Sequence, residues 1–215
     1  MNAGLYKIKI LTQYKSASLE EHVARSWRLT PMLDSYIETT PAQQRTGKSW
    51  FKGSADAVYQ CANTIIDEDP ALICVFGGDH VYKMDVRQML AWHIDNQADA
   101  TVAAVPVPRE EAKSFGVLEA DEEIRIIAFH EKVDDPPAMP GHPELSLASM
   151  GNYVFTTDSL MARLDEDADD ESSKHDFGHN ILPSMVRRGD RVFAYDFKTN
   201  MVPSEDHTSD SYRRD

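Results

Sequence analysis

The chain has 215 residues, 41% of them hydrophobic, which is enough to bury one substantial core. Its 36 acidic residues outnumber its 22 basic residues and give a formal net charge of -14. This balance disfavours nucleic acids and anionic membranes as partners, so any bound phosphate must be held locally, by a few placed side chains or a metal ion.

Apolar runs alternate with amphipathic segments along most of the chain. In chain order, the pattern predicts a strand at 7–11, a helix at 18–29, a turn-rich segment, a helix at 54–66, a strand at 71–76, a helix at 85–96, strands at 100–107, 116–119 and 124–130, a proline-marked loop, a strand at 149–155, helices at 158–164 and 180–188, and a strand at 191–197. A capping box at Ser18–Glu21 is expected to open the first helix. This alternation predicts an α/β fold with a mostly parallel, Rossmann-like sheet and helices on both faces.

The cysteine content indicates a reducing compartment. Two cysteines, Cys61 and Cys74, are too few for a disulfide framework, and both are expected to be buried and reduced. No apolar stretch approaches the ~18 residues of a membrane helix, and residues 1–6 lack a signal-peptide pattern. We therefore expect a cytoplasmic protein with no membrane partner.

The segment Ala71–His80 (ALICVFGGDH) combines an apolar run, two glycines and a carboxylate. The run is typical of a strand buried on both faces, as in parallel sheets covered by helices. Asp79 then follows the carboxyl end of a strand, the edge at which open α/β sheets bind ligands, and the glycines allow close approach of a bulky anion. The same letters would also fit a strand followed by an ordinary turn.

Three further segments place small or charged residues at the ends of predicted elements. Gly53 and Ser54 open a helix, whose free N–H groups can receive a polar ligand, although both residues also suit simple capping. Glu131 and Lys132 end a strand; they suit sugar hydroxyls and a phosphate, or form an ordinary exposed pair. Ser149 leads into a strand, where its hydroxyl would bond a ligand or the backbone.

Two acidic or histidine-rich patterns have less specific interpretations. The two histidines of His175–His179 (HDFGH) are four residues apart, as in some zinc sites, but a glycine lies between them and no third ligand is close in sequence. The Asp-Phe-Gly within this segment lacks the other protein-kinase motifs. The acidic run Asp165–Glu171 does not fit an EF-hand and is expected to be a solvated loop.

As an ordered set, these segments resemble the ADP-glucose pyrophosphorylase (glucose-1-phosphate adenylyltransferase) family of bacterial glycogen synthesis. The resemblance runs over almost the whole chain in family order. It is carried by Leu11–Lys15, Pro41–Arg45, Gly53–Val58, Gly78–Asp85, Phe115–Val117, Glu131–Lys132, Ala148–Gly151, Tyr153–Phe155 and His175–His179. The family transfers the adenylyl group of ATP to glucose 1-phosphate with Mg²⁺, and the resemblance implies the same substrates and cofactor here.

Matching positions imply roles for individual residues. Asp79 and Lys132 match catalytic residues, and Asp79 and Asp215 match the carboxylates that hold Mg²⁺. The matches to the glucose 1-phosphate site are Phe51, where the family often has tyrosine, together with Gly116, Glu131, Lys132 and Ser149. The matches to the nucleotide site are Gln43, Gln44, Gly53 and Ser54.

The resemblance covers part of a catalytic domain. Residues 1–215 match a partial nucleotidyltransferase domain, whose sheet is expected to be incomplete at both ends. The family's glycine-rich ATP loop and its C-terminal β-helix domain have no counterpart here, so the chain alone is expected to be inactive and the full-length parent to be a homo-oligomer. Two alternatives stay open: a related uridylyl- or thymidylyltransferase, and a non-catalytic subunit that binds sugar phosphate or has a regulatory role. The segment Pro41–Gln44, which would face the base, favours the adenylyl version.

Overall fold

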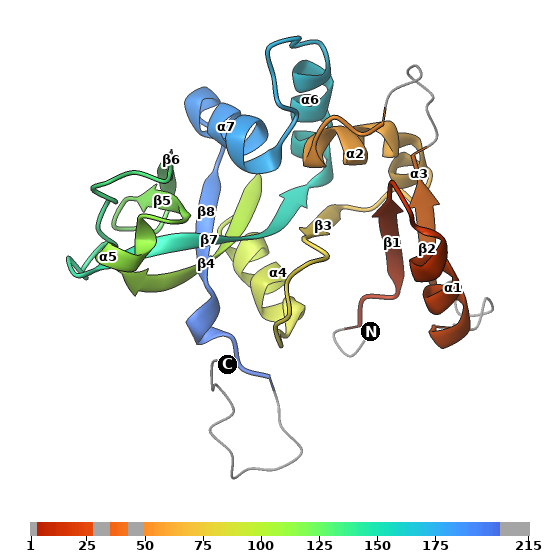
Figure 1. The fold of residues 1–215 in the computed structure, drawn as a ribbon. Helices are drawn as coiled ribbons and strands as arrows, with labels where there is room; N and C mark the ends of the chain where they lie inside the picture. The colour runs from red at the N-terminus through yellow and green to blue at the C-terminus, as the bar shows by residue number, and fades with distance from the viewer. Residues whose placement is uncertain (1–3, 28–34, 43–49, 203–215) are drawn as a thin grey trace.

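A computed structural model describes residues 4–27, 35–42 and 50–202, and Figure 1 shows their arrangement. The strands are β1 (Lys7–Thr12), β2 (Tyr36–Pro41), β3 (Leu72–Phe76), β4 (Ala100–Pro108), β5 (Gly116–Ala120), β6 (Ile126–Glu131), β7 (Leu145–Thr156) and β8 (Val192–Asp196). The helices are α1 (Ala17–Ser26), α2 (Ser54–Gln60), α3 (Ala62–Ile66), α4 (Val86–Asp95), α5 (Arg109–Ala112), α6 (Thr157–Ala168) and α7 (Leu182–Arg188). A π-helical turn (Phe177–Ile181) precedes α7, and a short 3-10 turn (Phe197–Thr199) follows β8. The predicted alternation of strands and helices is confirmed.

Six strands form the central sheet, in the order β6-β5-β7-β4-β8, with β3 paired to β7. β4 and β8 are parallel, whereas β7 runs antiparallel to β3, β4 and β5. Consequently β3, β4, β5 and β8 share one direction, and β6 and β7 run the other way. The α/β fold class is confirmed. The reversed direction of β7 has no signature in its apolar pattern, because a central strand is apolar whichever way it runs.

Helices cover both faces of this sheet, as expected. On β4, Val102 packs with one face's cluster while its neighbour Ala103 packs with the other. The first cluster includes buried residues of α2, α6 and α7, and the second includes Met89 of α4. Because successive strand residues point to opposite faces, α4 covers one face and the other three helices cover the opposite one (Figure 1).

The N-terminal part differs from the prediction. β1 pairs in parallel with β2 in a separate two-stranded sheet, although residues 36–41 fall in the segment expected to be turn-rich. This six-residue run becomes a strand by pairing with β1, and its own residues do not reveal that pairing. α1 begins at Ala17, one residue before the expected capping box, and Ser16 Oγ instead donates to Glu20 Oε1 at 2.6 Å.

Three other expectations are refined by the structure. β3 is half-buried rather than buried on both faces, because within the described residues it pairs only with β7. Its Cys74 is half-buried and Cys61 is buried; neither cysteine is part of a disulfide, and burial raises the pKa of Cys74 to about 11. The acidic run is not wholly a loop, since its first four residues end α6. Within the described ranges, no helix combines the length and the apolar character that crossing a bilayer requires.

Buried His93 makes the fold sensitive to acid. The residue is 1% exposed, with Nδ1 2.8 Å from Thr101 Oγ1 and Nε2 3.2 Å from Thr156 Oγ1. Burial lowers the pKa of His93 to about 4 from its ordinary 6.5. In the unfolded chain His93 binds a proton below about pH 6.5, whereas in the folded chain it stays neutral down to about pH 4. Protonation between these two pH values therefore favours the unfolded chain, and the contribution of neutral His93 to the free energy of unfolding is lost on acidification.

We expect acidification from about pH 7.5 to about pH 4.5 to lower the free energy of unfolding of the wild type by ~2 kcal/mol more than that of His93→Gln. Urea unfolding at the two pH values measures this difference. The exposed residue His22 supplies the control, because His22→Gln should keep the wild-type pH dependence. Equal pH dependence in wild type and His93→Gln would contradict the prediction.

Candidate active site

The turn after β3 carries Asp79 into solvent. β3 ends at Phe76, and the Asp79 side chain is 86% exposed, with Oδ1 3.6 Å from Nε2 of His80. A Cβ added at Gly77 would lie 3.1 Å from Asp79 Oδ1 and 3.3 Å from His80 Nδ1, so a larger residue there would crowd both side chains. The structure thus presents the carboxylate as expected, beyond the carboxyl end of a strand.

A bulge in β7 brings this turn against the sheet. Val102 of β4 pairs with Tyr153, but Ala104 pairs with Ser149, so β7 carries extra residues at this point. Gly151, inside the bulge, has a φ of +69°, which favours glycine, and a Cβ there would lie 3.3 Å from Cε1 of His80. The bulge therefore lets the His80 ring approach the β7 backbone closely.

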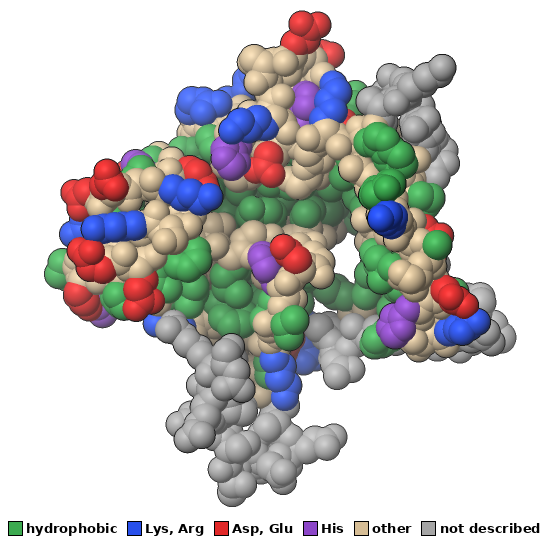
Figure 2. All heavy atoms as spheres, viewed as in Figure 1, with side chains coloured by type: hydrophobic (Ala, Val, Ile, Leu, Met, Phe, Trp, Pro, Cys, Tyr) green, Lys and Arg blue, Asp and Glu red, His purple; other side chains and the backbone are tan. Residues whose placement is uncertain are grey.

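A pocket of about 480 Å³ lies where the bulge, the β5–β6 pair and the segment before α7 meet. Its lining includes Gly116, Glu131 and Ser149, three positions assigned to the sugar phosphate from the sequence, and it also includes His80, Tyr153 and Asp176. Asp79 and Lys132 do not line it but directly adjoin lining residues. In Figure 2, hydrophobic side chains occupy the hollow in the viewed face, and charged side chains lie on the lobes around it.

The β5–β6 pairing sets the geometry of Glu131 and Lys132. Gly116 is the register partner of Glu131, and a Cβ at Gly116 would lie 3.0 Å from Glu131 Oε2. Lys132 has a φ of +51°, and its backbone N–H donates to the Phe115 carbonyl at 3.1 Å. Its Nζ lies 3.8 Å from Glu131 Oε1, with 68% of the side chain exposed. The carboxylate and the ammonium group are thus held side by side and remain accessible.

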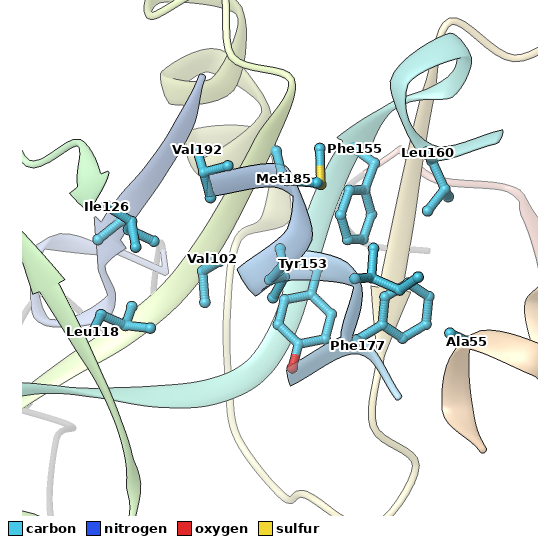
Figure 3. Packing of buried hydrophobic residues seen from close by; sticks show 14 of the residues in the cluster. Ala55, Val102, Leu118, Ile126, Tyr153, Phe155, Leu160, Phe177, Met185 and Val192 are labelled. Atoms are coloured by element: carbon cyan, nitrogen blue, oxygen red, sulfur yellow. The ribbon is translucent and has the colours of Figure 1, made fainter. Parts of the chain in front are cut away.

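Tyr153 and Asp176 are pocket residues that the sequence-based assignment missed. Burial, followed by the nearby charge of Asp176, raises the pKa of Tyr153 to about 12, so its phenol is neutral at physiological pH. Figure 3 shows the Tyr153 ring in the hydrophobic cluster with Phe155 and Phe177, its hydroxyl directed away from Phe155. Both residues belong to segments that carry the family resemblance, but only the fold brings the two side chains to the same pocket.

Asp176 is an ionised acceptor. Burial acts to raise the pKa of Asp176, but hydrogen bonds from His179 and Ser54 outweigh it and leave the pKa below its ordinary value. His179 N donates to Asp176 Oδ1 at 3.0 Å, and His179 Nδ1 lies 3.1 Å from the same oxygen. The other histidine of this motif, His175, is paired elsewhere, with Nδ1 2.8 Å from Asp167 Oδ2. The two histidines therefore have different carboxylate partners.

The start of α2 is closed by the segment before the π-helical turn. The N–H groups of Ala55 and Asp56 lie 2.8 and 3.4 Å from the His175 carbonyl and donate to it, so these groups are not free for a ligand as the sequence suggested. A Cβ at Gly53 would lie 2.3 Å from the same oxygen. Ser54 Oγ donates to Asp176 Oδ2 at 2.9 Å. Ser54 thus contacts a residue that lines the pocket, although neither Gly53 nor Ser54 lines it directly.

Of the other residues that the family resemblance assigns to a site, the structure describes Phe51 but not Gln43, Gln44 or Asp215. Phe51 is half-buried, and its backbone N–H donates to Gln13 Oε1 at 2.7 Å. Gln43, Gln44 and Asp215 lie outside the described residues. Among the residues that the structure describes, no three His, Cys, Asp or Glu side chains are grouped to hold a metal ion.

These contacts define a site with two kinds of binding group. The carboxylates of Glu131 and Asp176 offer acceptors of the type that sugar hydroxyls donate to. Lys132 offers a point charge suited to a phosphate. Asp79 offers an accessible carboxylate one residue away from the pocket-lining His80. Together they fit an anionic sugar derivative better than an apolar ligand.

Comparison with known proteins agrees with this chemistry. The family model described as nucleotidyl transferase matches residues 1–202. A glucose-1-phosphate adenylyltransferase of Anaeromyxobacter dehalogenans is 54% identical over 215 residues, which are 100% of this chain and 52% of the relative. Proteins of the same name from Mycolicibacterium smegmatis and Thermus thermophilus are 50% and 47% identical over 100% and 96% of the chain, which correspond to 53% and 51% of their own lengths. The chain spans about half the length of these curated relatives. On this evidence, the chain belongs to the nucleotidyl transferase family.

Proposed function

We propose that this chain provides the sugar-phosphate pocket and a metal-binding carboxylate of a glucose-1-phosphate adenylyltransferase. The reaction converts ATP and glucose 1-phosphate into ADP-glucose and pyrophosphate, for bacterial glycogen synthesis. The observation that carries the proposal is the meeting of Gly116, Glu131 and Ser149 in one pocket, although they come from three different strands. The names of the relatives, which are 47 to 54% identical to the chain, support the choice of substrates.

The proposed chemistry depends on positioning and on charge. A phosphate oxygen of glucose 1-phosphate forms a bond to the α-phosphorus of ATP, while the bond from that phosphorus to pyrophosphate breaks. Two anions must approach each other, so the protein has to orient them and offset their repulsion. Lys132 neutralises the sugar phosphate, and Glu131 and Asp176 accept hydrogen bonds from the sugar hydroxyls. No covalent enzyme intermediate is required.

Asp79 fits a role as a ligand of Mg²⁺. Proteins usually bind this ion through one or two carboxylates together with substrate phosphate oxygens, rather than through a full cage of side chains. Asp79 is 86% exposed and its Oδ1 lies no closer than 3.6 Å to the ring nitrogen of His80, so a carboxylate oxygen is available. We propose that Asp79 and Asp215 hold the ion, which when bound offsets the charge that develops on the phosphates.

The adenine specificity is inferred from the resemblance of Pro41–Gln44 to the family's nucleotide site. Uridylyl- and thymidylyltransferases would use the same arrangement of sugar and metal groups, so the base is the point to test. We also propose, from the same resemblance, that the whole protein is a cytoplasmic homo-oligomer.

The test uses a chimaera in which this chain replaces the matched segment of the Anaeromyxobacter dehalogenans relative. We expect the chimaera to form ADP-glucose and pyrophosphate from ATP, Mg²⁺ and glucose 1-phosphate, and much less product from UTP or dTTP. A folded chimaera without ADP-glucose formation would overturn the adenylyltransferase proposal. Binding of glucose 1-phosphate without turnover would instead favour a non-catalytic subunit that binds sugar phosphate.

Lys132→Ala should weaken glucose 1-phosphate binding about tenfold or more, because the phosphate loses a charge-assisted hydrogen bond. Isothermal titration calorimetry on the full chain measures the dissociation constant. Lys113→Ala is the matched control, since Lys113 is an exposed lysine paired with Glu110 at 2.9 Å and does not line the pocket. Equal affinities for the two variants would remove Lys132 from the proposed site.

A further inference from the structure

The hydroxyl group of Ser54 forms its hydrogen bonds with the pocket-lining residue Asp176 and with the residue after it. Its Oγ donates to Asp176 Oδ2 at 2.9 Å and accepts from the Phe177 N–H at 3.1 Å. A serine hydroxyl has one proton to donate, and here that proton is used by the Asp176 carboxylate. The Ser54 hydroxyl therefore cannot also donate to a nucleotide without releasing Asp176.

The two carboxylate oxygens of Asp176 accept different numbers of hydrogen bonds. Oδ1 faces both donors of His179, the backbone N–H at 3.0 Å and the ring Nδ1 at 3.1 Å. Oδ2 receives only the Ser54 hydroxyl among the described residues. A carboxylate oxygen has about two acceptor sites, so the site left open is on Oδ2. The oxygen that Ser54 holds is thus the one that can still accept a hydrogen bond from a ligand in the pocket.

Backbone hydrogen bonds between α2 and His175 hold the Ser54–Asp176 contact in place. The carbonyl of His175 receives the N–H groups of Ala55 and Asp56, which ties the first turn of α2 to the residue before Asp176. His175 is itself 5% exposed and paired with Asp167 of α6. Ser54 and Asp176 lie 122 residues apart in sequence, yet two backbone hydrogen bonds and two hydrogen bonds of the Ser54 hydroxyl fix their relative position.

We propose that Ser54 is a positioning residue for Asp176, holding Oδ2 where it accepts a hydroxyl group of bound glucose 1-phosphate. This inference rests on the proposed function, because it takes a sugar phosphate as the ligand of the pocket. It also reverses the role implied by the family resemblance, which placed Ser54 with the nucleotide. The start of α2 then sets the affinity for the sugar phosphate.

The first experiment measures glucose 1-phosphate binding to the full chain by calorimetry. Ser54→Ala should raise the dissociation constant about fivefold, the effect of losing one ordinary hydrogen bond. Ser54→Thr, which keeps a hydroxyl group, should restore most of the affinity. Ser159→Ala is the matched control, because Ser159 Oγ donates to Asp99 Oδ1 at 2.8 Å in an equivalent pair away from the pocket. In the chimaera, the same Ser54→Ala change should raise KM for glucose 1-phosphate and leave kcat and the KM for ATP within about twofold.

The second experiment needs no ligand. The Ser54 hydroxyl helps to keep the pKa of Asp176 low, so Ser54→Ala should raise the pKa of Asp176 in an NMR titration of the side-chain carboxyl, and Ser159→Ala should not. An unchanged Asp176 titration overturns the positioning role of Ser54, whatever the chain binds. If the titration shifts but wild-type protein binds no glucose 1-phosphate, the proposed function fails instead. An effect of Ser54→Ala on the KM for ATP alone returns Ser54 to the nucleotide site and overturns the inference.

Discussion

Asp79→Asn is expected to reduce ADP-glucose formation by the chimaera on the order of a hundredfold to a thousandfold, while glucose 1-phosphate still binds. Asparagine keeps the size of the side chain but removes the negative charge that attracts Mg²⁺. Asp79 does not line the pocket, and its nearest ionisable partner is His80, so the sugar-phosphate contacts should survive the change. The predicted signature is therefore a fall in kcat with little change in the affinity for glucose 1-phosphate.

Steady-state kinetics over a range of Mg²⁺ concentrations tests this prediction, with calorimetry for sugar-phosphate binding. Asp95→Asn is a suitable control, because Asp95 is an exposed aspartate at the end of α4, which covers a face of the sheet away from the pocket. Normal turnover in Asp79→Asn would exclude a metal role for this carboxylate. Loss of sugar-phosphate binding would instead indicate that the turn after β3 has collapsed into the pocket.

The fold could be predicted from the sequence wherever a pattern is local. Strand β3 and helix α4 were expected within a few residues of their observed bounds, because apolar runs and helical periodicity report burial directly. The direction of β7 could not be predicted, since strand direction depends on which neighbours pair with it. β2 was missed for the same reason: its short run becomes a strand through its pairing with β1.

The site residues also fall into those that short sequence segments indicate and those that only the tertiary structure places. The sequence motifs and the family resemblance point to Gly116, Glu131 and Ser149, and the structure brings these residues to one pocket. The positions of Tyr153 and Asp176 depend on the β7 bulge and on the segment before α7, neither of which follows from the residues' own neighbours in sequence. Sequence spacing places Ser54 at a helix start, and only tertiary structure shows that its hydroxyl bonds to a residue 122 positions away.

Gly53→Ala is expected to be the most damaging glycine-to-alanine change in the described part of the chain. An added Cβ would lie 2.3 Å from the His175 carbonyl oxygen and 2.4 Å from that of Lys174, which is far inside van der Waals contact. The φ of Gly53 is -165°, an extended conformation open to any residue, so the cost is steric rather than conformational. We expect the free energy of unfolding to fall by about 2–3 kcal/mol, as for overpacking in a well-packed region.

The clash cannot be relieved cheaply, because the carbonyl that it meets belongs to the backbone of His175, whose side chain is buried against Asp167. Moving that carbonyl would also break its hydrogen bonds from Ala55 and Asp56 and displace Asp176 next to it. Urea unfolding measures the loss of stability, and Gly78→Ala is the control, since a Cβ there meets nothing within 4 Å. If Gly53→Ala were as stable as Gly78→Ala, the close contact between α2 and the segment before Asp176 would be wrong, and the positioning of Asp176 by Ser54 would lose its structural basis.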